Sequence, residues 1–155
     1  MKQAIYRQTR RLAVAVLAAL AFGVAWPALA QGASPEGLWR TIDDETGAAK
    51  SLVRISREGD ALVGAVEQIL TPGKENALCE ACEGERHGKP VLGMRILWDV
   101  VQQGDEYGGG RILDPANGKT YKVKLWLGDD PNTLTVRGYI GLPLLGRSQT
   151  WQRVQ

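Results

Sequence analysis

The segment YKVKLWL, residues 121–127, decides the fold class of this 155-residue chain. Its apolar residues recur at every second position: Tyr121, Val123, Leu125 and Leu127. Lysines occupy two of the intervening positions. A period of two places one side of a β-strand in a core and the other side in water. The segment therefore predicts a half-buried strand whose lysines face the solvent.

Strong turn signals bound this strand and recur along the chain. DPANGK at 114–119 contains Asn-Gly, a frequent hairpin turn, and GDDPN at 128–132 contains Asp-Pro. No amphipathic pattern lasts long enough to predict a helix. The alternation predicts eight strands, near residues 36–43, 49–57, 60–70, 92–103, 107–113, 119–127, 132–140 and 147–154. Eight antiparallel strands suit an all-β barrel whose interior is filled by side chains or holds one small ligand.

The two ends of the predicted sheet favour a barrel over a sandwich. GLW, residues 37–39, opens the first strand, and TWQRV, residues 150–154, closes the last. This arrangement resembles the lipocalin and fatty-acid-binding barrels, in which a G-x-W tryptophan lies at the barrel floor and an arginine of the last strand packs across it. The resemblance implies that Arg153 lies over Trp39, a favourable cation–aromatic contact. Arg147 is a second candidate for that arginine, and Trp39 could equally be an ordinary core aromatic.

A longer resemblance covers nearly all of the chain after residue 36. The chain contains, in the order typical of the exported bacterial family known as domain of unknown function 2147, the segments GLWRTIDDETGAAKSLVRI, GAVEQIL, CEAC, GGGRILDPANGKTYKVKL and LTVRGYIGLPLLGRSQTW. The resemblance implies an exported, compact, β-rich domain with a lipocalin-like barrel. It implies no particular activity.

The first 30 residues have the composition of a secretory signal peptide. A start with four Lys or Arg residues precedes a short apolar run at 12–25, and ALA at 28–30 offers small residues for cleavage. The apolar run is too short for a comfortable membrane span. We therefore expect cleavage after Ala30, a single β-barrel domain over 31–155, and a periplasmic or secreted protein that is not embedded in a membrane.

Removal of the first 30 residues also changes the charge. The chain has 19 basic and 17 acidic residues, and four of the basic residues lie in that segment, which leaves 15 basic against 17 acidic residues, a net charge of −2. No basic patch large enough to follow phosphates remains, so we expect no nucleic-acid partner. The chain has one histidine and no G-x-S-x-G, phosphate-loop or HExxH motif. The sequence therefore predicts neither an enzyme nor a cofactor.

Both cysteines and the single histidine lie in CEACEGERHGKP, residues 79–90. A structural zinc site would need a fourth ligand besides Cys79, Cys82 and His87, which a neighbouring glutamate would have to supply. A redox CxxC would need a helix start that lowers a thiol pKa, whereas this stretch is acidic and predicts no helix. We favour a disulfide between Cys79 and Cys82, without metal, that staples a long loop between the third and fourth strands.

One polar pair is a candidate anchor for a ligand. In TVRGYIG, residues 135–141, Arg137 and Tyr139 fall on the same face of a strand. Fatty-acid-binding barrels hold a carboxylate with an inward Arg-x-Tyr pair on the last strand, because both side chains donate hydrogen bonds to it. Here the pair lies on the penultimate strand, and an outward Arg137 would merely be solvated. Trp39 and Tyr121 complete the predicted ligand contacts.

Two functions agree with these residues. In the first, which we favour slightly, the protein is a carrier or sensor of a small amphiphilic anion held in an apolar interior. In the second, the barrel is filled, and the stapled loop and the apolar stretch GLPLLGR, residues 141–147, contact another envelope protein. The sequence leaves the choice open, because a slip of one residue exchanges the inner and outer faces of a strand.

Overall fold

The structure is a computed structural model that describes residues 34–154. The predicted signal peptide lies outside the described residues. The strands within the described part are β1 (Gly37–Ile42), β2 (Ala49–Glu58), β3 (Ala61–Ile69), β4 (Arg95–Gln103), β5 (Glu106–Gly108), β6 (Arg111–Asp114), β7 (Lys119–Leu127), β8 (Thr133–Tyr139) and β9 (Arg147–Arg153). Two short 3-10 helices, η1 (Gly84–Arg86) and η2 (Pro143–Leu145), interrupt the longest loop and the β8–β9 connection.

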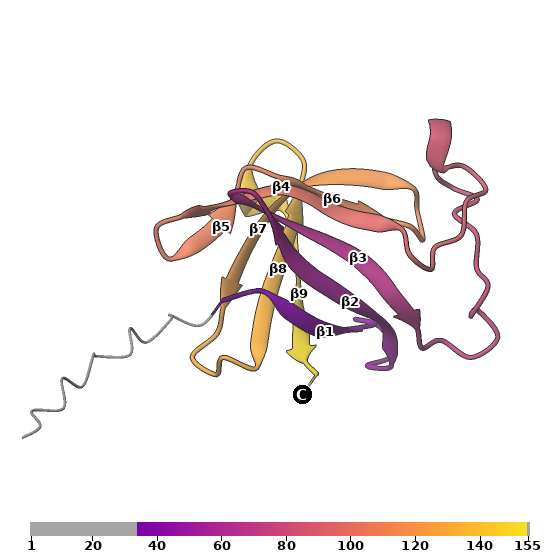
Figure 1. The fold of residues 1–155 in the computed structure, drawn as a ribbon, viewed down its shortest axis with the longest axis horizontal. Helices are drawn as coiled ribbons and strands as arrows, with labels where there is room; N and C mark the ends of the chain where they lie inside the picture. Colours follow the sequence, from indigo (N-terminus) through magenta and orange to yellow (C-terminus); the bar gives the residue numbers. More distant parts are fainter. Residues whose placement is uncertain (1–33, 155) are drawn as a thin grey trace, which may run out of the picture. The chain divides into compact units, whose positions relative to one another are not determined.

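The strands form one closed antiparallel barrel (Figure 1). Their order is β3-β2-β1-β9-β8-β7-β5-β4-β6, and the further pairings of β3 with β4 and of β7 with β6 close the sheet. β5 and β6 act as two halves of one bent strand, because each pairs with β4 on one side and with β7 on the other. The barrel therefore has eight strand positions, and the predicted all-β, eight-stranded, lipocalin-like fold is confirmed.

Glycines make the bend between β5 and β6. A Cβ atom on Gly110 would lie 2.3 Å from the Trp98 carbonyl oxygen, so β4 comes too close for any other residue. On the facing strand, Asp99 has a φ of 59°, in the left-handed region that aspartate tolerates better than most residues. At Asp99 the register of β4 against β3 shifts, between the partners of Leu62 and Gly64, and this bulge helps the sheet to curl into a barrel.

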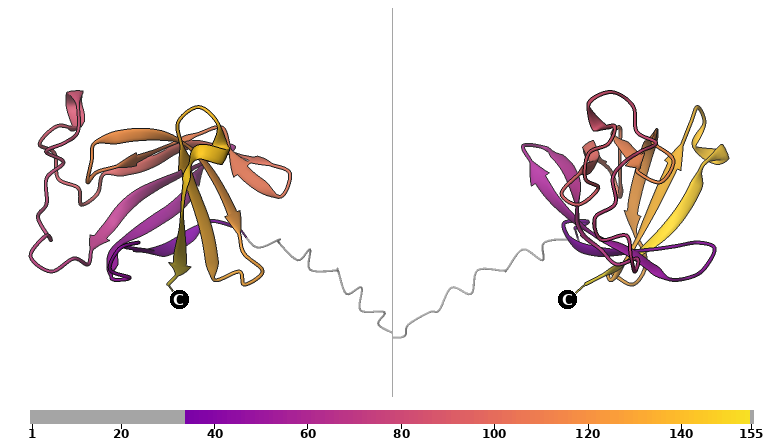
Figure 2. Two further views of the ribbon diagram at one scale, coloured as in Figure 1. Left: turned by 180° about the vertical axis from the view of Figure 1, so that it is seen from behind. Right: turned by 90° about the vertical axis from the view of Figure 1, so that its right-hand side faces the viewer.

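The two ends of the barrel differ. At one end, here called the floor, tight connections join β2 to β3, β4 to β5 and β7 to β8. At the other end, here called the mouth, lie the β1–β2 and β6–β7 turns, the β8–β9 loop and the long loop at 70–94 between β3 and β4. The right view of Figure 2 shows this long loop in front of the barrel, between the purple strands and yellow β9.

A packed core occupies the floor half of the barrel. Its fully buried side chains come from strands all around the barrel: Trp39, Val53, Ile55, Leu62, Leu97, Val100, Val123, Leu125 and Leu134. Val123 and Leu125 belong to the segment that predicted the fold. Lys122, which lies between Tyr121 and Val123 in the chain, is exposed. The inner face of β7 was therefore predicted correctly.

Candidate ligand cavity at the barrel mouth

A cavity of about 800 Å³ lies above this core, at the mouth. Its base consists of apolar side chains from facing strands: Val66, Ile96, Ile112, Val136 and Trp151. Ala77, Leu78 and Val91 of the long loop line its edge. The volume lies within the range of roughly 300–1,000 Å³ that is usual for small-molecule sites. The barrel is thus packed near the floor and hollow near the mouth. The second function considered from the sequence assumed a barrel filled throughout, which differs from this structure.

Polar side chains line the cavity in hydrogen-bonded pairs. The hydroxyl oxygens of Thr41 and Ser51 are 2.8 Å apart across β1 and β2. Trp151 Nε1 donates to Gln149 Oε1 at 3.3 Å, and Gln149 Nε2 donates in turn to Asp44 Oδ2 at 3.0 Å. Because these polar groups already have hydrogen-bond partners, none of them requires a ligand. A side chain of each pair can nevertheless rotate to form a hydrogen bond with a polar ligand atom.

Three cations stand at the rim of the cavity: Lys50, Lys74 and Arg147. Lys50 Nζ lies 3.6 Å from an oxygen of Asp43, and Arg147 Nη2 lies 2.8 Å from an oxygen of Asp44. Both pairs are open to solvent, where an ion pair contributes little to stability. A ligand anion can therefore compete for these cations.

Asp43 itself is held as a carboxylate by the β1–β2 turn. The backbone N–H and the hydroxyl of Thr46 both donate to Asp43 Oδ1 at 2.9 Å, and the N–H of Glu45 donates at 3.1 Å. The hydrogen bonds from Thr46 are the main reason that the pKa of Asp43 lies below its ordinary value, and Lys50 adds to the effect. The turn therefore carries a fixed negative charge beside the rim.

Tyr121 reaches the cavity from β7. Its phenol oxygen accepts a hydrogen bond of 3.1 Å from Asn117 Nδ2, which also donates to Asp114 at 3.0 Å. All three residues line the cavity. Of the four residues predicted to contact a ligand, Tyr121 is thus placed where the prediction requires.

Trp39 lies at the floor. It is fully buried, its Nε1 donates to the Pro35 carbonyl at 2.7 Å, and the Arg153 guanidinium lies 4.2 Å from the centre of its ring. The contact between Arg153 and Trp39 implied by the lipocalin resemblance is therefore present. Arg147, the second candidate for this arginine, lies at the mouth. Trp39 does not line the cavity, so this cavity does not offer the ligand contact predicted for it.

Arg137 faces away from the cavity. Its neighbours Leu134 and Val136 are buried inside the barrel, so the odd-numbered residues of β8 lie on the outer face. Its guanidinium donates to the carbonyls of Pro143 at 2.7 Å and Leu144 at 3.0 Å. The prediction that Arg137 anchors a ligand from inside is wrong, and the side chain is not merely solvated either, because it holds the β8–β9 loop.

Tyr139 shares the outer face of β8 with Arg137. It contributes to the rim of the cavity but lies close enough to Lys124, on the outer face of β7, to affect that amine. The pKa of Lys124 is raised, mainly by its 2.8 Å hydrogen bond to Glu106 and to a smaller extent by Tyr139. The predicted Arg-x-Tyr pair therefore exists as a pair on one face, but the face is the outer one.

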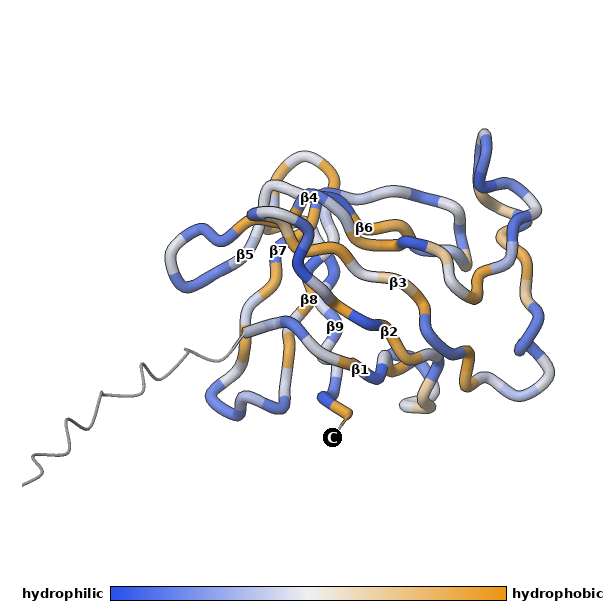
Figure 3. Tube along the Cα trace, viewed as in Figure 1, coloured by the Kyte–Doolittle hydropathy of each residue, from blue (hydrophilic) through white to orange (hydrophobic). Residues whose placement is uncertain are grey.

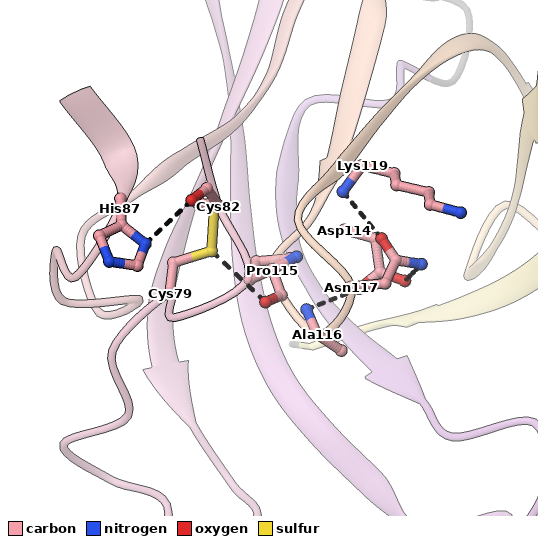
Figure 4. The surroundings of a disulfide bond; sticks show 8 residues. All are labelled: Cys79, Cys82, His87, Asp114, Pro115, Ala116, Asn117 and Lys119. Atoms are coloured by element: carbon pink, nitrogen blue, oxygen red, sulfur yellow. Dashed lines mark hydrogen bonds between the residues drawn. A yellow bond between two sulfur atoms is a disulfide. The ribbon is translucent and has the colours of Figure 1, made fainter. Parts of the chain in front are cut away.

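The two cysteines form a disulfide at the mouth (Figure 4). The Cα atoms of Cys79 and Cys82 are 5.3 Å apart, and both residues are buried. Cys79 Sγ lies 3.4 Å from the Pro115 carbonyl oxygen in the β6–β7 turn, and His87 Nδ1 lies 3.1 Å from the Cys82 carbonyl oxygen. The predicted disulfide is confirmed, and in this structure neither sulfur is a free thiol. Within residues 34–154, no three metal-ligating side chains converge.

Two further contacts fasten the stapled loop, residues 70–94, to the barrel. A Cβ atom on Gly118 would lie 1.8 Å from the Ala81 carbonyl oxygen, so the loop backbone occupies the space where a side chain of the β6–β7 turn would stand. On the outer wall, the Arg86 guanidinium lies 4.8 Å from the centre of the Trp98 ring in β4. The loop is therefore a fixed part of the cavity wall. Sequence patterns gave no signal for either contact, because each joins residues distant in the chain.

These features define the class of the protein. A closed eight-stranded antiparallel barrel, with an arginine over a tryptophan at the floor and a hollow mouth, is a lipocalin-like barrel. The chain belongs to the family described as "Uncharacterized protein conserved in bacteria (DUF2147)", whose family model matches residues 37–153. The family predicted from the order of the sequence segments is thus confirmed.

The solved structures include a protein of similar fold. The chain is similar to HP1028 of Helicobacter pylori, which is described as belonging to the lipocalin family, with a TM-score of 0.69 and 19% sequence identity over 79% of this chain and 84% of that chain. At this identity the similarity shows the fold alone. No curated protein matches the chain. No helix in the described part is long and apolar enough to cross a membrane.

Proposed function

We propose that the protein is an exported carrier or sensor that binds a small amphiphile in the cavity at the barrel mouth. The observation that carries this proposal is the cavity itself, about 800 Å³ in volume, apolar at its base and cationic at its rim. An alkyl chain on Val136 and Trp151 would be removed from water, which is the main source of affinity for such ligands. The disulfide, in a protein of a bacterial family, supports an oxidising compartment such as the periplasm.

We assign the polar end of the amphiphile to the rim and give it a negative charge. Lys74 has no ion pair among the described residues, and the partners of Lys50 and Arg147 are partly exposed carboxylates with which an incoming anion can compete. A carboxylate or phosphate would accept hydrogen bonds from the ammonium and guanidinium groups. These three cations replace the pair Arg137 and Tyr139 as the proposed anchors.

The cavity side chains support binding rather than catalysis. The residues that line it include neither histidine nor cysteine, and His87 lies outside it. Among its hydroxyl groups, those of Thr41 and Ser51 pair with each other and that of Tyr121 pairs with the Asn117 amide, so their recorded partners are not bases that would activate a nucleophile. The residues that line the cavity are therefore suited to holding a ligand unchanged.

The test is a comparison of three ligands that share one alkyl chain: dodecanoate, dodecanol and dodecyltrimethylammonium. Each would be titrated against a fluorescent probe bound in the cavity. We expect dodecanoate to displace the probe best and the cationic ligand worst. Failure of all three to bind the unaltered protein would refute the proposal, and a preference for the cationic ligand would refute the assignment of a negative head group.

A variant that plugs the cavity tests the location. A Cβ atom on Gly138 would lie 3.5 Å from the Tyr121 Cβ, an ordinary contact, so the side chain of Gly138→Leu can enter the cavity without moving the backbone. The matched control is Thr150→Leu, at an exposed position of β9. We expect dodecanoate affinity to fall roughly tenfold or more in the first variant and to stay unchanged in the second. Equal affinities would place the ligand elsewhere.

A further inference from the structure

Four large apolar side chains of the β8–β9 connection project into solvent beside the cavity. Ile140, Leu142, Leu144 and Leu145 are 69, 66, 85 and 79% exposed. Residues 140–145 are called the leucine loop here; it lies at the top of Figure 1 and is coloured orange and pale in Figure 3. Single exposed leucines are ordinary on protein surfaces, but four such side chains within six residues form an apolar patch that a soluble domain rarely leaves uncovered without a use.

Three carbonyl groups of the leucine loop, those of residues 142–144, are satisfied within the protein. The carbonyls at positions 142 and 143 accept hydrogen bonds of 3.1 and 3.0 Å from the N–H groups of Leu145 and Gly146. Arg137 donates to the carbonyls at 143 and 144, and also to Ser148 Oγ at 2.7 Å. A segment that enters hydrocarbon must satisfy its backbone internally, because lipid chains offer no partner. Arg137 thus holds a loop in which three carbonyls have partners and the leucines are exposed.

The leucine loop continues the apolar surface of the cavity. Ile140 and Leu145 line the rim, and Val136 and Ile112 follow below them on the wall. An alkyl chain that passed from a lipid layer into the cavity at this point would remain on apolar side chains throughout. A rim of purely polar residues would instead expose the chain to water during the passage.

The strands next to the leucine loop carry unpaired positive charge on their outer face. Lys122 is the register partner of Tyr139 at the end of β8, and Arg111 is the register partner of Lys122. Neither cation forms an ion pair with any described residue. Like charges opposite each other on a sheet repel, and an anionic surface would relieve that repulsion.

We propose that the leucine loop inserts into the surface of an anionic lipid membrane, and that the protein loads or releases its amphiphile there. The exchange of ligand rests on the proposed function, whereas the insertion does not. The three satisfied carbonyls at 142–144, the adjoining cations and the apolar path into the cavity together favour a lipid surface over a protein partner.

The test is sedimentation of the purified protein with lipid vesicles. One set contains phosphatidylglycerol with phosphatidylcholine, and the other contains phosphatidylcholine alone. We expect the protein to sediment with the anionic vesicles, less with the neutral ones, and less again when salt is raised, since salt screens charges at the surface. The double variant Leu142→Ser, Leu144→Ser, whose two side chains are exposed and do not line the cavity, should bind anionic vesicles roughly tenfold or more weakly.

The matched control is the double variant Leu92→Ser, Val101→Ser, which removes two exposed apolar side chains, 50 and 36% exposed, that do not line the cavity. It should bind vesicles as the unaltered protein does. Equal losses in both double variants would overturn the proposal, and so would no vesicle binding by the unaltered protein. Capture of one envelope protein through the leucine loop, without vesicle binding, would overturn it in favour of a protein partner.

Ligand binding from solution separates this proposal from the proposed function. The leucine-loop variant should still bind dodecanoate, and Gly138→Leu should still sediment with vesicles while it loses dodecanoate. If the unaltered protein binds dodecanoate but no vesicles, the insertion fails and the proposed function stands. If it binds vesicles through the leucine loop but no dodecanoate, the insertion stands and the proposed function fails.

Discussion

Gly118 and the carbonyl group of Ala81 are in such close contact that a Cβ atom on Gly118 would lie 1.8 Å from the Ala81 oxygen. Ala81 lies between the two bridged cysteines, and Gly118 lies in the turn between β6 and β7. This contact joins the stapled loop to the barrel and so shapes one edge of the cavity.

The contact predicts different costs for two glycine substitutions. Gly118→Ala and Gly141→Ala share a left-handed backbone, with φ of 70° and 72°, but a Cβ atom on Gly141 would have no neighbour within 4 Å. We expect Gly141→Ala to lower the free energy of unfolding by about 1 kcal/mol, and Gly118→Ala to lower it by roughly 3 kcal/mol, because the loop must also move. Urea denaturation measures both, and equal losses would contradict the contact.

Removal of the disulfide should loosen the mouth and leave the barrel folded. The variant Cys79→Ala, Cys82→Ala opens a very short ring, so the expected loss in the free energy of unfolding is about 2 kcal/mol. Hydrogen exchange should become faster in the loop at 70–94 and stay slow in β7 and β8. Faster exchange throughout the barrel would show instead that the disulfide supports the whole fold.

Arg153 should be the residue that fastens the floor. Besides its place over Trp39, it donates to the carbonyls of Ser34 and Glu36 at 2.8 Å each. Arg153→Met keeps much of the packing but removes the donors, and we expect a loss of roughly 2–3 kcal/mol in the free energy of unfolding. Gln152→Met, at an exposed position next in the chain, is the control and should cost little. A similar small cost for both would mean that the floor contact adds no stability.

Arg137→Met separates the two roles considered for this side chain. Because the guanidinium bonds the leucine loop on the outer face, dodecanoate affinity should stay within about twofold of that of the unaltered protein. Vesicle binding should fall, since the carbonyl at 144 loses its donor and the carbonyl at 143 keeps only the N–H of Gly146. Calorimetric titration gives the affinity, and a large loss of dodecanoate affinity with unchanged vesicle binding would restore Arg137 as a ligand anchor.

The β1–β2 turn should make part of the stability depend on acid pH. The pKa of Asp43 is lowered in the folded protein, mainly by hydrogen bonds from Thr46, so its carboxylate stabilises the fold above the ordinary pKa of an unfolded aspartate, and that stabilisation is lost as the pH falls through the lowered value. Asp43→Asn should therefore be less stable than the unaltered protein near neutral pH, and the difference should shrink in acid. Urea midpoints measured across this range check it, and a difference that grows in acid would contradict the assignment.

The sequence by itself determined the local features of this protein. Alternation in YKVKLWL and its neighbours, with glycine and asparagine turns between them, specified eight strands, because a strand and its turns depend on residues adjacent in the chain. The bridge between Cys79 and Cys82 could be predicted for the same reason, since its two ends lie three residues apart.

Only the tertiary structure decided which face of β8 lies inside. Arg137 and Tyr139 share a face in any register, but the face turned to the core follows from the pairing of β8 with β7 and β9, where Leu134 and Val136 pack against buried side chains of other strands. The same holds for the hollow mouth. The size of the cavity depends on how side chains from every strand meet, and on where the loop at 70–94 contacts the β6–β7 turn, and both are relations between residues far apart in the chain.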